Sequence, residues 1–266
     1  MMTTPFQNDD GSPLDIRVII VGIEGQLVNT EQLHYEKWER IALRAGYTEE
    51  GFRKLWKSQL IGIGDEAVYK KLQANAPTSK KLPKWEVVRE QINKYYLKHF
   101  YAAQFLEGEA DAIDMLTRFG VRFIVVTHAT GELADMQLDR IKSEIGTALW
   151  NKDPVSGKRK DVVLGKRKDG NAYDDIFNEI NKERLANNLP PLKRENFLVL
   201  ENKKEYRDKA RSFGMHALGL RLDLADHLKP ETPDDEDLSI KWEDITAFIV
   251  RGPVPQSGIS PATAPR

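Results

Sequence analysis

The stretch that decides the fold is Arg17-Val18-Ile19-Ile20-Val21-Gly22-Ile23-Glu24-Gly25-Gln26-Leu27-Val28-Asn29-Thr30-Glu31. Its run Val18–Val21 is apolar without polar alternation, which is typical of a strand buried on both faces of a parallel sheet. Gly22 and the polar turn after it end the strand, and a helical pattern begins at Glu31. In open α/β sheets, ligands bind just beyond the carboxyl ends of strands, so this turn is the first candidate site.

Apolar runs of the same kind recur along the chain and predict further buried strands. They are Phe123–Val126, Val162–Leu164, Phe197–Leu200 and Ala217–Leu220. Amphipathic helical patterns alternate with them, at Ala110–Phe119, Gly131–Glu144, Asp175–Ala186 and Lys204–Phe213. This alternation predicts an α/β fold, a Rossmann-like, doubly wound parallel sheet with helices on both faces.

The long segment between the first two strands is almost entirely helical in pattern. Its predicted helices are Leu33–Ala45, Glu49–Leu60, Asp65–Leu72 and Trp85–Phe105. Such a segment is too long for a simple crossover, so we expect an inserted α-helical cap over the carboxyl edge of the sheet. The predicted division is an α/β core at 14–30 and 110–250, a cap at 31–109, and disordered ends at 1–13 and 251–266.

Composition narrows the classes of function. The net charge of −1 and the pI near 6.6 argue against a dedicated nucleic-acid binder, which usually carries a strong basic excess. The chain has no cysteine, which excludes disulfides, thiol catalysis and zinc–thiolate sites. No apolar stretch approaches the ~20 residues that span a bilayer, and the first 13 residues resemble no targeting segment. We therefore expect a cytoplasmic protein that does not contact membranes.

The opening stretch resembles the first motif of the haloacid dehalogenase (HAD) superfamily, in its β-phosphoglucomutase and small-phosphatase branch. That motif is an apolar strand, then Asp-x-Asp-Gly-x-Leu-x-Asp-Thr-Glu, then a helix with His and Trp. The residues that fit the frame are Gly25, Leu27, Thr30, Glu31, His34 and Trp38. The resemblance implies a HAD core with a helical cap. It also puts Gly22 at the position of the nucleophilic Asp and Glu24 at that of the acid/base.

The other motifs of the family carry over in part. Thr127 keeps the hydroxyl that the resemblance implies for phosphate binding. In the metal-binding fourth motif, Glu201 remains and Asn202 replaces an Asp. A gapless fit of the third motif places Asn171 where a Lys is expected, and makes Asp175 open the following helix. In a gapped alternative, Lys166 or Lys168 supplies the charge.

These replacements remove the usual chemistry. Aspartyl-phosphate catalysis needs a carboxylate nucleophile, and Gly22 has no side chain. The side chain of Glu24 is one methylene longer than Asp, which displaces an acid/base. Mg²⁺ is typically held by carboxylates, so with Glu201 and Asn202 alone it should bind weakly at most, and no cofactor is expected.

Three functions follow from this pattern. The preferred one is a catalytically impaired HAD-like protein, a pseudoenzyme that acts as a binding or structural component with an unknown protein partner. The alternative is a hydrolase of divergent mechanism, in which Glu24 activates water while Thr127 and Lys166 or Lys168 clamp the substrate. The third is a phosphate- or RNA-binding accessory protein.

The third function depends on two copies of Gly-Lys-Arg-Lys-Asp, at 157–161 and 165–169. Clusters of Lys and Arg bind polyanions without sequence preference. The residues concerned are Lys158, Arg159, Lys160, Lys166, Arg167 and Lys168. We favour the simpler interpretation that both copies are solvated loops around a short strand. His128 also follows a strand, but without a second His nearby we do not expect it to bind a metal.

Overall fold

The computed structural model of the chain describes residues 14–61, 63–77, 81–127, 129, 131–145, 162–164, 170–220, 222, 225, 228 and 240–249. Several sequence predictions concern segments outside these ranges. They are the predicted disordered ends, both basic pentapeptides and His128. Among the described residues, no helix has the combination of length and apolar composition that crossing a membrane requires.

A parallel sheet forms the centre of the core, with the strand order β5-β4-β1-β6-β7. The strands are β1 (Val18–Gly22), β4 (Arg122–Thr127), β5 (Val162–Leu164), β6 (Phe197–Leu200) and β7 (His216–Leu218). Val18 pairs with Arg122 on one side and Phe197 on the other, so β1 is the central strand. The predicted strands are all present. The last one ends early, at Leu218, because Leu220 leaves the ladder and forms an isolated bridge with Ile240.

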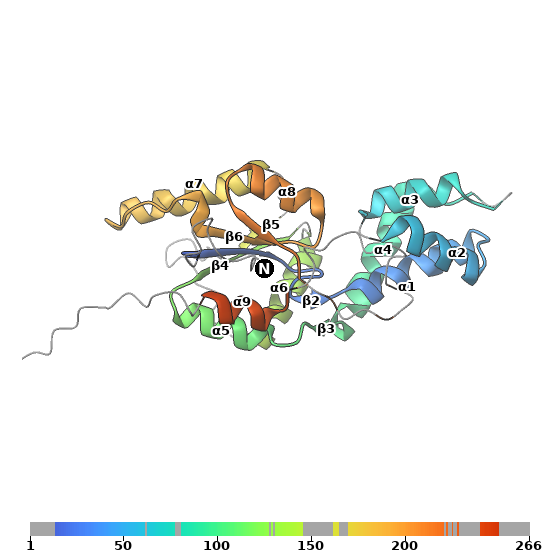
Figure 1. The fold of residues 1–266 in the computed structure, drawn as a ribbon. Helices are drawn as coiled ribbons and strands as arrows, with labels where there is room; N and C mark the ends of the chain where they lie inside the picture. The colour runs from blue at the N-terminus through green and yellow to red at the C-terminus, as the bar shows by residue number, and fades with distance from the viewer. Residues whose placement is uncertain are drawn as a thin grey trace, which may run out of the picture.

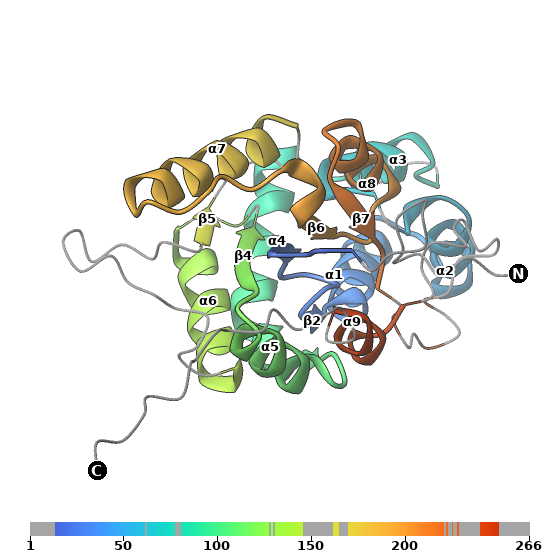
Figure 2. The ribbon, with the colours of Figure 1, turned by 60° about the vertical axis from the view of Figure 1, so that its left-hand side comes forward.

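Helices cover both faces of the sheet (Figure 2). One face carries α7 (Gly170–Ala186) and α8 (Lys204–Ser212), and the other carries α5 (Glu109–Arg118), α6 (Gly131–Ile145) and α9 (Trp242–Ile249). The residues of β1 alternate between these layers. Val18 and Ile20 pack towards α7, whereas Ile19 and Val21 pack towards α5 and α6, and all four are at most 1% exposed. The apolar run without alternation therefore reflects burial on both faces, as predicted.

The inserted segment forms a helical lobe beside the core (Figure 1). It comprises α1 (Glu31–Arg44), α2 (Glu49–Leu55), a π-helical turn (Trp56–Leu60), α3 (Asp65–Ala74) and α4 (Trp85–His99). Aromatic side chains fill its centre, with Tyr35 packed against both Phe52 and Trp56. The fold is thus an α/β Rossmann-like core with an inserted helical cap, which confirms the predicted fold class.

The chain enters and leaves the cap through two short antiparallel strands, β2 (Val28–Asn29) and β3 (Gln104–Phe105). We call this pair the hinge. The prediction that one helix runs from Trp85 to Phe105 was wrong, because α4 ends at His99 and a 3₁₀ turn (Phe100–Ala102) precedes β3. The backbone of Gln104 and Phe105 pairs with β2, so it is not available for the hydrogen bonds of a longer helix. Arg140 of α6 also holds this turn, by donating to the carbonyl oxygens of Phe100 and Ala103.

Two further elements differ from the sequence prediction. Helix α7 begins at Gly170, so Asp175 lies in its second turn and does not open it. Helix α9 was not predicted, and it packs against α5 and against the centre of the sheet through Trp242 and Ile245. A 3₁₀ turn (Arg194–Asn196) leads into β6.

Candidate functional site

The turn after β1 is held in place by the loop that follows β6. Gly25 has φ +76°, a left-handed conformation that favours glycine. A Cβ atom at this position would lie 3.1 Å from Nδ2 of Asn202. That nitrogen donates a 2.6 Å hydrogen bond to the Gly25 carbonyl, and Oδ1 of Asn202 accepts one from the Leu220 N–H at 3.0 Å. Asn202 therefore braces the turn, and both the nitrogen and the oxygen of its side-chain amide are hydrogen-bonded to the backbone.

Glu24 is held by one residue from the core and one from the cap. Gln137 of α6 donates from Nε2 to Oε1 of Glu24 at 2.9 Å, and Nε2 of His34 lies 3.5 Å from Oε2. Burial alone would raise the pKa of Glu24. The hydrogen bond from His34, the positive charges of His34 and Lys37, and the hydrogen bond from Gln137 outweigh burial and lower this pKa to about 2. Glu24 is therefore ionised at neutral pH, and the 38% of its side chain that is exposed also favours the carboxylate.

A second carboxylate faces His34 from within the cap. Asp65, the first residue of α3, lies 3.9 Å from Nδ1 of His34 and 2.7 Å from Nζ of Lys37, and accepts a 2.8 Å hydrogen bond from the Trp38 indole. Burial opposes ionisation here too, but the charges of Lys37 and His34 and these hydrogen bonds lower the pKa of Asp65. We call Glu24, His34, Lys37, Asp65 and Gln137 the clasp, because they join core and cap.

The predicted phosphate-binding hydroxyl is part of the same network. Thr127, at the end of β4, is 5% exposed. Its hydroxyl lies 3.2 Å from Oε1 of Gln137 and accepts a hydrogen bond from the Ala129 N–H at 3.1 Å. Gln137 is fully buried and bridges Thr127 to Glu24. The structure therefore brings Thr127 and Glu24 to one place, but it engages both of them with protein groups.

The residues at the family's metal positions do not fit a Mg²⁺ ion. Gly22 has no side chain, the amide of Asn202 braces the turn, and Glu24 pairs with His34. Glu201 is 2% exposed, and its Oε1 accepts a hydrogen bond from the Lys203 N–H at 3.1 Å. Across the residues that the structure describes, no group of three or more His, Asp or Glu side chains is arranged to hold a metal. Mg²⁺ prefers several hard oxygen ligands, and this donor set does not provide them.

The third-motif position stays a prediction. Asn171 lies in the first turn of α7, but its side chain is outside the described set. Lys166 and Lys168, the gapped alternative, also lie outside the described residues.

Sequence analysis missed three members of the clasp, Lys37, Asp65 and Gln137. Two of them could have been recognised from the hydrophobic pattern of their helices. Lys37 lies between Leu33 and Ile41 on the buried stripe of α1, and Gln137 lies within the apolar stripe of α6. A polar residue on an apolar stripe needs a buried hydrogen-bond partner. Each of these two residues therefore predicts a buried hydrogen bond, but the sequence does not identify the partner.

The comparisons with known proteins come from structure alone. No protein-family model matches the chain, and no curated protein matches it in sequence. Among solved structures, a putative β-phosphoglucomutase from Thermotoga maritima superimposes with a TM-score of 0.58 at 17% identity, over 88% of this chain and 99% of that one. CbbY from Rhodobacter sphaeroides, solved with phosphate, gives 0.57 at 15% identity, over 86% and 96%.

A third similar structure is a haloacid dehalogenase-like protein of unknown function from Agrobacterium tumefaciens. It gives a TM-score of 0.58 at 15% identity, over 88% of this chain and 98% of that one. A predicted phosphoglycolate phosphatase from Haemophilus somnus is also similar, with a TM-score of 0.55 at 12% identity, over 77% of this chain and 85% of that one. This chain therefore has the HAD-like fold, as its first motif predicted.

Proposed function

We propose that this protein is a HAD-like pseudoenzyme, which does not transfer phosphoryl groups and acts as a binding or structural component. One observation carries the proposal. Glu24, the acidic residue of the turn after β1, is held as an anion between Gln137 and His34, while Gly22 offers no side chain.

The absence of a side chain at Gly22 removes the covalent step. A phosphoryl-enzyme intermediate needs a nucleophilic side chain in line with phosphorus. Glu24 is the only acid in the turn, and it is committed to the clasp. The turn itself is fixed by Asn202, so a shift of Glu24 into the place of the missing Asp would break the hydrogen bonds of this brace.

In the divergent-hydrolase alternative, Glu24 would act as a general base. Catalytic acids and bases work best with a pKa near the working pH. With a pKa of about 2, Glu24 is a weak base, and at pH 7 roughly one molecule in 10⁵ has it protonated, so it is no acid either. These properties favour the pseudoenzyme over the hydrolase.

The clasp also supports a binding or structural role. Glu24 and Gln137 belong to the core, whereas His34, Lys37 and Asp65 belong to the cap. Enzymes with lids must open them to exchange substrate and product. Here the contact between His34 and Glu24 joins cap and core beside the turn after β1. An interaction that holds the two lobes together suits a protein that presents a fixed surface to a partner.

The phosphate- or RNA-binding function has no support from the described residues, because both basic pentapeptides lie outside them. It stays a sequence prediction. Binding to heparin or RNA at about 50 mM salt that is lost as salt rises would favour it, since phosphate contacts release condensed counterions. A protein partner likewise stays a proposal.

The test is an activity measurement with matched variants. We expect no hydrolysis of phosphomonoesters above background with Mg²⁺ present, and no trapped beryllium-fluoride adduct. Glu24→Gln should leave this background unchanged, as should Glu86→Gln, a control at an exposed glutamate in the first turn of α4. Robust turnover that survives Glu86→Gln and disappears in Glu24→Gln would refute the proposal and favour the hydrolase.

A further inference from the structure

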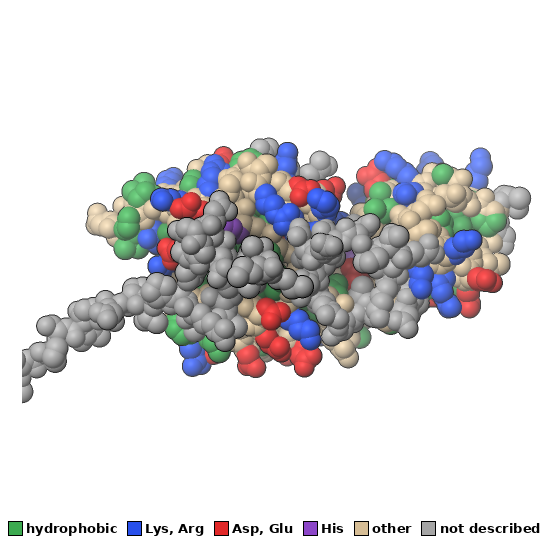
Figure 3. Space-filling view, in the orientation of Figure 1, with side chains coloured by type: hydrophobic (Ala, Val, Ile, Leu, Met, Phe, Trp, Pro, Cys, Tyr) green, Lys and Arg blue, Asp and Glu red, His purple; other side chains and the backbone are tan. Residues whose placement is uncertain are grey.

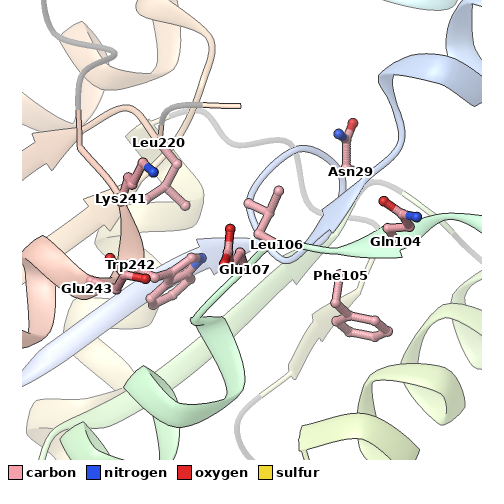
Figure 4. A pocket seen from close by; sticks show the side chains of 9 residues that line it. All are labelled: Asn29, Gln104, Phe105, Leu106, Glu107, Leu220, Lys241, Trp242 and Glu243. Carbon is pink, nitrogen blue, oxygen red and sulfur yellow. The ribbon is translucent and has the colours of Figure 1, made fainter. Parts of the chain in front are cut away.

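A cleft opens between the hinge and the start of α9 (Figure 4). It encloses about 180 Å³, and no residue of the clasp lines it. Asn29 and Gln104, which pair across the hinge, form one side. Lys241, Trp242 and Glu243 at the start of α9 form the other. The cleft is therefore built from segments that are far apart in the sequence.

Polar atoms make up most of the surface of the cleft, and three apolar side chains lie beneath it and are held in place. Trp242 is 1% exposed, and its indole N–H donates a 3.0 Å hydrogen bond to the carbonyl of Gln26 in the turn after β1. Leu220 is 2% exposed, and its N–H is held by Asn202. Leu106 completes this surface, and its N–H donates to the carbonyl of Leu27. Ligand pockets commonly combine such a wall with a few placed polar groups.

The rim carries charges of both signs. Lys241, Glu107 and Glu243 are exposed and line the cleft, and the Lys241 ammonium and the Glu107 carboxylate point into the same space (Figure 4). Figure 3 shows acidic side chains gathered over α9 and the adjoining part of α5, with a basic group beside them. Within the described part of the chain, none of these three side chains forms an ion pair.

We propose that this cleft binds a small zwitterion of the amino-acid class, with its ammonium between Glu107 and Glu243 and its carboxylate towards Lys241. A simple anion would face two glutamates, whereas a simple cation could pair with them but would leave Lys241 without an opposite charge. A molecule with both groups meets an opposite charge on each side. Leu106, which is partly exposed, offers a contact for a short aliphatic side chain, and the small volume excludes a folded partner.

Such a ligand would also act on the hinge. Asn29 accepts a hydrogen bond from the Glu31 N–H at 3.3 Å, so it touches the first residue of the cap. A molecule that contacts both hinge strands and α9 would restrict movement of the cap relative to the core. The cleft would thus make the protein a sensor of that ligand, whether or not the clasp supports any chemistry.

The experiment is isothermal titration of the full chain with glycine, alanine, valine and leucine. We expect at least one to bind in the millimolar range or tighter. For valine the matched analogues are isobutylamine, which lacks the carboxylate, and 3-methylbutanoate, which lacks the ammonium. Each should bind at least about tenfold more weakly, because each leaves one side of the rim without its opposite charge.

Variants locate the site. Lys241→Met and the double variant Glu107→Gln with Glu243→Gln should each weaken binding at least about tenfold. The exposed pair Lys84→Met and Glu86→Gln, at the start of α4, should leave binding unchanged. No binding of any of the four amino acids at about 10 mM, equal binding of either analogue, or unchanged binding in the cleft variants would each overturn the proposal. Since no readout is enzymatic, these outcomes are independent of the phosphatase test.

Discussion

Replacing Glu109 by glutamine should stabilise the protein at neutral and alkaline pH. Glu109 is the first residue of α5 and is 2% exposed, and neither carboxyl oxygen has a hydrogen-bond partner within the described part of the chain. Burial, together with the negative charge of Glu144 on α6, raises the pKa of Glu109 to about 9. At pH 7 this carboxyl is therefore protonated in the folded protein and ionised in the unfolded chain.

The sign and the size of the effect follow from that difference. Below the ordinary pKa of 4.5 both states are protonated, and stability is lost as pH rises from there through about 9. Each pH unit corresponds to about 1.4 kcal/mol, so the loss is about 3 kcal/mol at pH 7. Glutamine does not ionise, but its additional buried N–H donor costs about 1 kcal/mol. The net gain at pH 7 should be about 2 kcal/mol.

Urea denaturation at pH 5, 7 and 8.5 measures this gain. Glu109→Gln and the wild type should be nearly equal at pH 5, and the variant should be more stable by about 4 kcal/mol at pH 8.5. Asp111→Asn, at an exposed position on the same helix, is the control and should show no growing gap. The reasoning fails if the free energy of unfolding of Glu109→Gln has the same pH dependence as that of the wild type, or if the variant is less stable at pH 8.5.

Three further outcomes are expected. Asn202→Asp removes the donor to the Gly25 carbonyl, so it should lower the free energy of unfolding by about 1–3 kcal/mol. Added Mg²⁺ should not restore this stability, and a Mg²⁺-dependent rise in the Tm of the variant would contradict the bracing role. Arg140→Met leaves the carbonyls of Phe100 and Ala103, just before β3, without their charged donor, and should cost about 3 kcal/mol and speed hydrogen exchange at the hinge. Unchanged exchange would show that the hinge does not need this residue. His34→Ala removes the first of the groups that hold the Glu24 carboxylate ionised, so the Glu24 pKa measured by NMR should rise from about 2, and no rise would show that the clasp does not set it.

The sequence by itself determined the fold class and the absence of a side chain at position 22. Val18–Val21 is apolar without alternation because β1 is central and packed on both faces, and such a pattern is local and can be recognised in the chain. The helical periodicity of the cap is local for the same reason. The absence of a side chain at Gly22 needs no structure at all, since no fold can supply a carboxylate that the residue lacks.

Only the tertiary structure decided what the remaining site residues do. Glu24 and Gln137 are 113 positions apart, and nothing in either local pattern pairs them. Asn202 was expected as a weak metal ligand and instead braces the turn, because the loop after β6 brings its amide against the Gly25 carbonyl. Local patterns report whether a residue is buried, whereas its partner depends on how distant elements pack. That packing placed Glu24 between Gln137 of the core and His34 of the cap.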